Sequence, residues 1–124
     1  MMSEPRQVVR WHIYPSANAV RQKAVTVVCR AADEAIARNG IFNLVLAGGT
    51  TPQAVYESLR EVSAEWDKWQ IWFGDERCLP SDHPERNSRM AREAWLAHVP
   101  VPAGQIHLMS AELCAKAGAA AYAV

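Results

Sequence analysis

The chain has 124 residues, of which 50% are hydrophobic and 21% are charged. This composition is typical of a globular protein rather than a disordered tail, and the length suits a single domain. Thirteen basic residues balance thirteen acidic ones, so the chain lacks the basic excess with which proteins hold nucleic acid. No apolar run approaches the roughly 18 residues of a membrane-spanning helix, and residues 1–10 contain no apolar segment typical of a secretory signal.

Three cysteines stand at positions 29, 78 and 114, and they form no Cys-x-x-Cys pair. An odd number of scattered cysteines is typical of a reduced compartment, so we expect a cytoplasmic protein. The histidines and cysteines also lack the spacing of a metal site. The sequence therefore predicts no metal centre.

The first predicted elements are a strand and a long helix. Residues 8–14 are rich in β-branched and aromatic side chains, which favours a strand. Ser16 can cap a helix whose apolar residues recur at spacings of three and four between Val20 and Ile36. The Asn-Gly pair that ends with Gly40 is a typical C-terminal signal, so we expect the helix to end there.

A second strand and a second helix follow. Residues 41–47 form a nearly unbroken apolar run, which predicts a strand buried on both faces of a parallel sheet. After two glycines, Thr51 can cap a helix that has Pro52 as its first residue. Val55 and Leu59 then face the core.

Two further strands and helices complete the pattern. Residues 69–74 predict a third strand, and Asn87 or Ser88 can cap a helix that runs to about residue 98. Residues 105–109 predict a short fourth strand, and a helical pattern resumes at Ala111. This alternation predicts an α/β fold, with a mainly parallel sheet and flanking helices in the order β-α-β-α-β-α-β-α.

The segment Gly-Gly-Thr-Thr-Pro at residues 48–52 lies after the second strand, where ligands bind in open α/β sheets. Two glycines allow the backbone to approach a ligand closely, and the helix N-terminus offers unpaired N–H groups beside threonine hydroxyls. These features suit a phosphate monoester. An ordinary strand-to-helix turn has the same composition, so the residues alone leave both interpretations open.

Three charged residues, Asp75, Glu76 and Arg77, directly follow the third strand. A carboxylate in this place can act as a general base, and an arginine can bind an anion or stabilise an oxyanion. The alternative is a solvated strand end with a local ion pair. His83 in the following loop is a further candidate base, but the sequence offers it no matched partner and we interpret it as a surface residue.

Two stretches carry a resemblance to a known family. Residues 44–59 (LVLAGGTTPQAVYESL) and 69–96 (WQIWFGDERCLPSDHPERNSRMAREAWL) resemble two motifs of the glucosamine-6-phosphate isomerase/6-phosphogluconolactonase family. The resemblance covers nearly the whole chain in order. Asp-Glu-Arg followed by Cys-Leu-Pro is similar to the lactonase branch, because the deaminase branch usually has a tyrosine in place of Arg77.

The resemblance implies a Rossmann-like, cofactor-free cytoplasmic enzyme that acts on a small sugar phosphate. The implied reaction is hydrolysis of 6-phospho-D-glucono-1,5-lactone to 6-phosphogluconate in the pentose phosphate pathway. In this hypothesis four residues bind the phosphate, one carboxylate positions or activates water, and one arginine binds an anionic group or stabilises the oxyanion. The residues are Gly48, Gly49, Thr50 and Thr51 for the phosphate, Asp75 and Arg77 for catalysis, and Asn87 near the substrate.

The chain also departs from the family pattern. Arg86 stands where the family often has a serine, and its role stays open. Family members are much longer and carry a later Gly-x-Asp-Gly-His segment, whose histidine is thought to be the general base. This sequence contains no such segment. We therefore expect residues 1–124 to be the N-terminal portion of a single, truncated sugar-phosphate lactonase domain.

Two other functions remain open. One is isomerisation with deamination of an amino sugar phosphate, in which Asp75 would abstract the C2 proton. The other is a sugar-phosphate-binding or inert fragment without turnover. The sequence does not determine the oligomeric state, although an interrupted sheet with an unpaired edge is expected to promote self-association.

Overall fold

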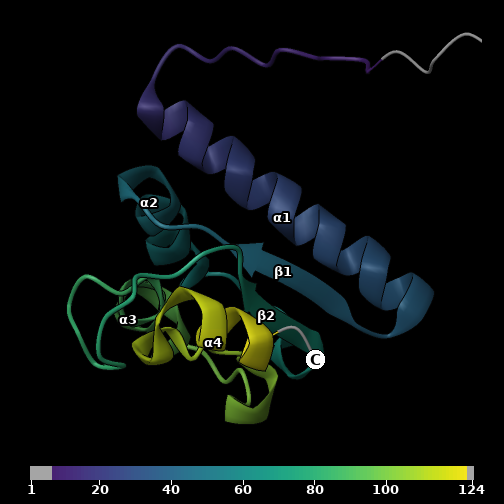
Figure 1. Cartoon of the computed structure of the whole chain (residues 1–124). Coiled ribbons are helices and arrows are strands. Elements are labelled where there is room, and N and C mark those ends of the chain that lie inside the picture. Colours follow the sequence, from purple (N-terminus) through teal and green to yellow (C-terminus); the bar gives the residue numbers. More distant parts are fainter. Residues whose placement is uncertain (1–6, 123–124) are drawn as a thin grey trace, which may run out of the picture.

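The computed structural model describes residues 7–122, in which two short strands lie among helices (Figure 1). The helices and strands are α1 (Ala17–Asn39), β1 (Phe42–Leu46), α2 (Thr50–Leu59), β2 (Trp69–Phe73), α3 (Asn87–Ala91) and α4 (Cys114–Tyr122). A π-helical turn, Arg92–Leu96, continues α3. The predicted α/β class is confirmed by this alternation of strands and helices.

Helix α1 begins and ends where the sequence predicts. The hydroxyl of Ser16 accepts a hydrogen bond from the backbone N–H of Ala19 at 3.1 Å, which caps the first turn. At the other end Gly40 adopts a left-handed φ of 80°, and its N–H donates to the carbonyl of Ile36 at 2.9 Å. These two caps explain why the helix keeps its predicted length.

Strands β1 and β2 pair in parallel, in a register that sets Phe42 opposite Trp69 and Leu46 opposite Phe73. Helix α2 lies between them in the chain, so the three elements form a βαβ unit. The parallel sheet that the sequence predicts is therefore present. Because the strands run in the same direction, the segments that follow them emerge at the same edge of the sheet.

The core lies on one face of this sheet. The strand residues that point into it are at most 8% exposed, and they are Phe42, Leu46, Trp69, Ile71 and Phe73. Side chains from α1, α2 and the π-helical turn pack against them. The ring of Trp69 lies 4.7 Å from that of Trp66 and 5.9 Å from that of Trp95, centroid to centroid. These three tryptophans are at most 6% exposed, so their rings form part of the core.

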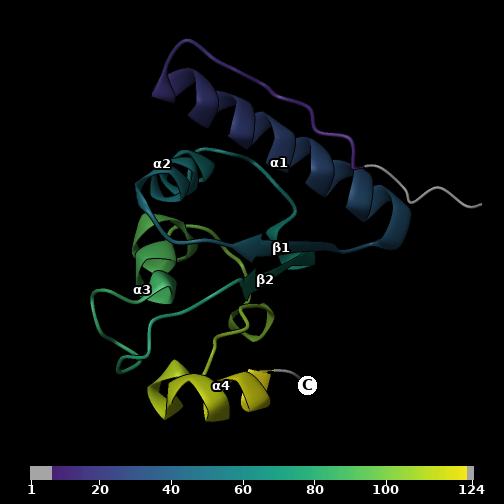
Figure 2. The same ribbon diagram turned by 45° about the horizontal axis from the view of Figure 1, so that its top comes forward.

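The opposite face of the sheet is only partly covered. Figure 2 shows α1 on one side of the two strands and α4 on the other. The ring of Trp72 in β2 stacks on His107 at 3.8 Å and meets the edge of Tyr122 in α4 at 6.0 Å. Val45 in β1 is 63% exposed on this face. The prediction that residues 41–47 are buried on both faces is therefore wrong, because α4 covers β2 and leaves β1 in contact with solvent.

The predicted first strand, residues 8–14, is not formed. Trp11 and Ile13 are 83% and 88% exposed. Within the described part of the chain, no backbone hydrogen bond joins this segment to a neighbouring strand. β-branched and aromatic residues favour a strand only where a pleated neighbour offers them packing and backbone partners. Residues 8–14 have neither in this structure.

The predicted fourth strand, residues 105–109, is reduced to one parallel bridge between Ile71 and Ile106. The N–H of His107 donates to the carbonyl of Ile71 at 2.8 Å. The next bond of the ladder is replaced by a side chain, because the hydroxyl of Tyr122 accepts from the N–H of Phe73 at 3.0 Å and donates to the carbonyl of His107 at 3.1 Å. A hydroxyl group inserted between the two backbones prevents the strand from continuing.

Candidate active site

The candidate residues lie where β1 and β2 end. The N–H of Gly74 after β2 donates to the carbonyl of Leu46 at the end of β1, at 3.0 Å. This bond holds the two strand ends together, so the turn after β1 and the charged segment after β2 start side by side. Parallel pairing thus brings together two motifs that are about 25 residues apart in sequence.

Each glycine of the turn after β1 stands where an added side chain would be unfavourable. Gly49 has a φ of 106°, a left-handed conformation that side chains rarely allow. At Gly48 a Cβ atom would lie 2.3 Å from Oδ1 of Asn87. Helix α2 begins at Thr50 with Gly49 as its N-cap, so the predicted cap at Thr51 is wrong by two positions. Gly49 takes that place because its conformation directs the chain into the helix.

Tyr56 fixes the base of this turn. Its hydroxyl donates to the carbonyl of Ala47 at 2.8 Å and accepts from the N–H of the same residue at 3.0 Å. Burial raises the pKa of the Tyr56 hydroxyl above its ordinary value, and the hydrogen bond with Ala47 opposes that rise. Tyr56 belongs to the first of the two stretches that resemble the family, residues 44–59, but nothing in its spacing indicates a bond to a residue nine positions earlier.

Glu76 forms the inner part of the site. Its carboxylate accepts backbone hydrogen bonds from Arg77 at 2.8 Å, from Asn87 at 2.6 Å and from Ser88 at 2.9 Å. Its side chain is 1% exposed, and Oε2 lies 3.4 Å from Nε of Arg86. Burial raises the pKa of the Glu76 carboxyl, but hydrogen bonds from the three backbone N–H groups and the Ser88 hydroxyl prevail and lower it.

This carboxylate also caps α3. The prediction of Asn87 or Ser88 as the cap is wrong, because Arg86 occupies the N-cap position and its side chain makes no capping bond. Glu76 instead satisfies the first N–H groups of the helix from a different element. Capping across 11 and 12 residues leaves no local sequence signal.

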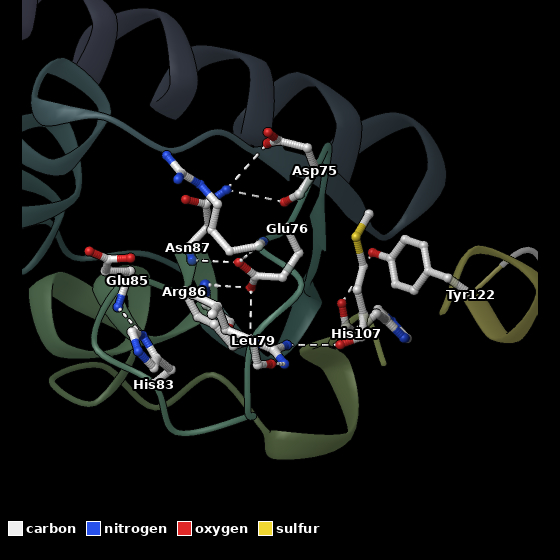
Figure 3. Close-up of polar contacts among 12 residues, drawn as sticks. Asp75, Glu76, Leu79, His83, Glu85, Arg86, Asn87, His107 and Tyr122 are labelled. Atoms are coloured by element: carbon white, nitrogen blue, oxygen red, sulfur yellow. Dashed lines mark hydrogen bonds and ion pairs between the residues drawn. The ribbon is translucent and has the colours of Figure 1, made fainter. Parts of the chain in front are cut away.

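Asp75 and Asn87 face each other beside the turn (Figure 3). The side-chain amide of Asn87 donates to the backbone carbonyl of Asp75 at 3.2 Å and to its carboxylate at 3.3 Å. Asp75 is exposed and Asn87 is partly buried. The amide therefore orients a carboxylate that remains open to solvent. His83 lies in the loop, where its Nδ1 accepts from the N–H of Glu85 at 3.1 Å.

A pocket of about 310 Å³ connects several of the candidates. Its lining residues are Gly49, Thr50, Gln53, Arg77, Pro84, Glu85, Arg86, Asn87 and Met90. Gly48 and Asp75 do not line this pocket, but both lie next to Asn87, which does. Thr51 lines a separate pocket of about 280 Å³ together with residues of α1, and Thr50 lines both. Gln53 and Glu85 were missed in the sequence, where no pattern distinguishes them from surface residues.

The described residues 7–122 contain no group of three or more His, Cys, Asp or Glu side chains placed to hold a metal ion. Over the same range, none of the helices combines the length and the apolar character needed to cross a membrane.

Residues 15–124 match the family model described as "Glucosamine-6-phosphate isomerases/6-phosphogluconolactonase". The chain belongs to this family. The family resemblance inferred from the two motifs is thus confirmed.

Individual members of the glucosamine-6-phosphate isomerase/6-phosphogluconolactonase family are similar over most of the chain. This chain is 38% identical over 95 residues to a 6-phosphogluconolactonase of Nostoc sp. and 41% identical over 88 residues to one of Synechocystis sp.. The matches cover 77% and 71% of this chain, but 40% and 37% of those relatives. The crystal structure of 6-phosphogluconolactonase from Thermotoga maritima superposes with a TM-score of 0.73 at 27% identity, over 86% of this chain and 47% of that one. The chain therefore spans less than half the length of these relatives.

Proposed function

We propose that this chain is the N-terminal portion of a single 6-phosphogluconolactonase domain, which hydrolyses 6-phospho-D-glucono-1,5-lactone to 6-phosphogluconate. The observation that carries the proposal is the pocket in which the glycine turn, Arg77 and Asn87 meet beside Asp75. The family and the lactonases among its relatives support the choice of substrate. A cytoplasmic location, the absence of a cofactor and the small sugar phosphate as ligand belong to the same proposal.

In this proposal the phosphate binds at the N-terminus of α2. Gly49 and Thr50 line the pocket, and the first N–H groups of a ten-residue helix are available to an anion there. Gly48 allows the backbone to pass close to Asn87. Thr51 faces the neighbouring pocket, so its contribution is confined to its backbone N–H group and to the dipole of the helix.

Asp75 and Arg77 are proposed to act on the lactone. The exposed Asp75 carboxylate, oriented by Asn87, positions the attacking water. Arg77, which lines the pocket, binds an anionic group or stabilises the tetrahedral oxyanion. General base catalysis supplies about 10² to 10⁴ in rate. The family segment that carries the histidine base has no counterpart in this sequence. We therefore expect the 124 residues to bind 6-phosphogluconate but to hydrolyse the lactone slowly.

Deamination of an amino sugar phosphate is a second candidate, because the family description includes isomerases. In that reaction Asp75 would remove the C2 proton. Arg77 argues against it, since the resemblance places a tyrosine there in the deaminase branch. Release of ammonia from glucosamine-6-phosphate by the 124-residue chain would favour this candidate over the lactonase.

The test is calorimetric titration of the full chain with 6-phosphogluconate, joined to a coupled dehydrogenase assay of lactone hydrolysis. We expect binding by the wild type, weaker binding by Arg77→Gln, and unchanged binding by Arg38→Gln, an exposed arginine near the end of α1. Asp75→Asn should lower any rate above a blank without protein, whereas Asp67→Asn, an exposed aspartate before β2, should not. Failure of the wild type to bind 6-phosphogluconate would refute the proposed function.

A further inference from the structure

The carboxylate of Glu76 is buried directly behind the candidate site. Its side chain is 1% exposed, and it is absent from the residues that line the pocket. Oε1 accepts from the N–H groups of Arg77 and Asn87, and Oε2 accepts from that of Ser88. One side chain therefore joins the end of β2 to the first turn of α3.

Arg86, which also lines the pocket, pairs with this carboxylate. It is 1% exposed, and its Nε lies 3.4 Å from Oε2 of Glu76. The guanidinium also donates to the carbonyl of Leu79 at 3.3 Å and to that of Met109 at 2.8 Å. A buried ion pair is held in place when further hydrogen bonds satisfy its remaining donors. Arg86 thus ties Glu76 to the loop after β2 and to the segment that precedes α4.

Asn87 is held in position through its backbone and through its side chain. Its backbone N–H is held by Glu76 at 2.6 Å, and its side-chain amide donates to Asp75. Its Oδ1 occupies the space that a Cβ atom on Gly48 would need. Figure 3 shows Glu76 between Asp75 and Arg86, with Asn87 beside it. The bond between Gly74 and Leu46 sets the backbone at Asp75, and the placement of its side chain relative to the glycine turn depends on Asn87 and Glu76.

We propose that Glu76, with Arg86 as its counterion, is a positioning residue that sets the Asp75 carboxylate and the Asn87 amide at the distance from the glycine turn that fits a phosphorylated sugar acid. This inference rests on the proposed function. In this inference the turn at Gly49 binds the phosphate part, because the hydrogen bonds of Glu76 go to Arg77, Asn87 and Ser88 and not to the turn. The Asp75–Asn87 pair adds the recognition of the sugar part, and that recognition requires the support of Glu76.

The selectivity of binding tests this division. The full chain and its Glu76→Gln variant are titrated separately with 6-phosphogluconate and with inorganic phosphate, and binding is followed by amide NMR. We expect Glu76→Gln to weaken 6-phosphogluconate binding by about tenfold or more, the effect of losing a hydrogen bond to a charged group. The affinity for inorganic phosphate should change less than about twofold. Glu65→Gln is the matched control, because Glu65 pairs with Lys68 on the surface. An equal loss for both ligands would assign Glu76 a structural role and overturn the proposal.

A measurement without ligand separates this inference from the proposed function. In Glu76→Gln we expect the signals of the Asn87 side-chain amide and of the Asp75 carboxyl carbon to shift, and the backbone N–H groups of Asn87 and Ser88 to exchange faster with deuterium. Unchanged signals would overturn the positioning role even if binding fell. If the wild type binds neither ligand, the proposed function fails and these signals still decide the role of Glu76.

A second variant, Glu76→Asp, provides the test if Glu76→Gln does not fold. Glu76→Asp keeps the charge beside Arg86 but withdraws it by one methylene group, so the chain retains the ion pair with longer contacts to α3. We expect shifts in the same direction as in Glu76→Gln but smaller, and a partial recovery of the preference for 6-phosphogluconate. A Glu76→Asp spectrum identical to that of the wild type around Asp75 and Asn87 would also overturn the proposal.

Discussion

Replacement of Gly48 by alanine tests how closely the glycine turn and Asn87 are packed. The added Cβ would lie 2.3 Å from Oδ1 and 2.8 Å from Cγ of Asn87. Gly48 is not among the glycines of positive φ, so the cost is steric rather than conformational. Asn87 cannot yield freely, because Glu76 holds its backbone and Asp75 its side chain.

The magnitude follows from these contacts. Forcing one extra carbon into a packed site costs about 1–3 kcal/mol, and rotation of Asn87 away from Asp75 removes hydrogen bonds worth about 1 kcal/mol. We expect Gly48→Ala to lower the free energy of unfolding by about 2–3 kcal/mol. Gly104→Ala is the matched control, because a Cβ there meets nothing within 4 Å, and it should stay within about 0.5 kcal/mol of the wild type.

A double-mutant cycle in urea identifies the cause. In the Asn87→Ala background the clashing amide is absent, so Gly48→Ala should cost about 1 kcal/mol or less. The two substitutions would then show a coupling energy of about 1–2 kcal/mol. If Gly48→Ala destabilises the Asn87→Ala chain as much as it destabilises the wild type, the contact with Asn87 is not the reason why alanine is unfavourable at position 48.

Two further predictions concern acid stability and the exposed sheet. Because the pKa of Glu76 is lowered in the folded chain, the unfolded chain takes up a proton first as the pH falls below the ordinary value of 4.5. The contribution of Glu76 to the free energy of unfolding is thus complete above pH 4.5 and is lost as the pH falls through the folded-state pKa. Glu76→Gln should therefore flatten the dependence of the urea midpoint on pH in this range. An equally steep dependence in the wild type and the variant would contradict this prediction. Val45 is 63% exposed on the uncovered face of β1, so analytical ultracentrifugation should reveal self-association of the wild type. Val45→Asp should weaken this association by about 1–3 kcal/mol. A wild type that is monomeric at all concentrations would refute this expectation.

The features that sequence predicts well here are local. Helix α1 follows from Ser16, Gly40 and the apolar spacing between them, and all of these signals act within one helix. Strand β2 follows from a short aromatic and apolar run. The turn and the Asp-Glu-Arg segment were placed correctly at adjoining strand ends, because parallel pairing fixes that geometry.

The features that sequence did not predict depend on partners far away in the chain. Residues 8–14 have strand-forming side chains, but they lack a neighbour in this structure. The short bridge at Ile106 ends because a hydroxyl from Tyr122 enters the ladder. Glu76 resembled a solvated charge, although it is the cap of α3 and the partner of Arg86. No single-sequence pattern encodes these contacts.

The bond between Tyr56 and Ala47 bears on when the glycine turn becomes ordered. Because one hydroxyl satisfies both backbone groups of Ala47, the turn cannot separate from α2 without breaking two partly buried hydrogen bonds. The turn and the helix therefore move as one body. The conformational entropy of the turn is lost when the chain folds, so in the proposed function the anion would meet a turn that is already ordered. The affinity for that proposed anion would then reflect contact and desolvation, with little further loss from loop closure.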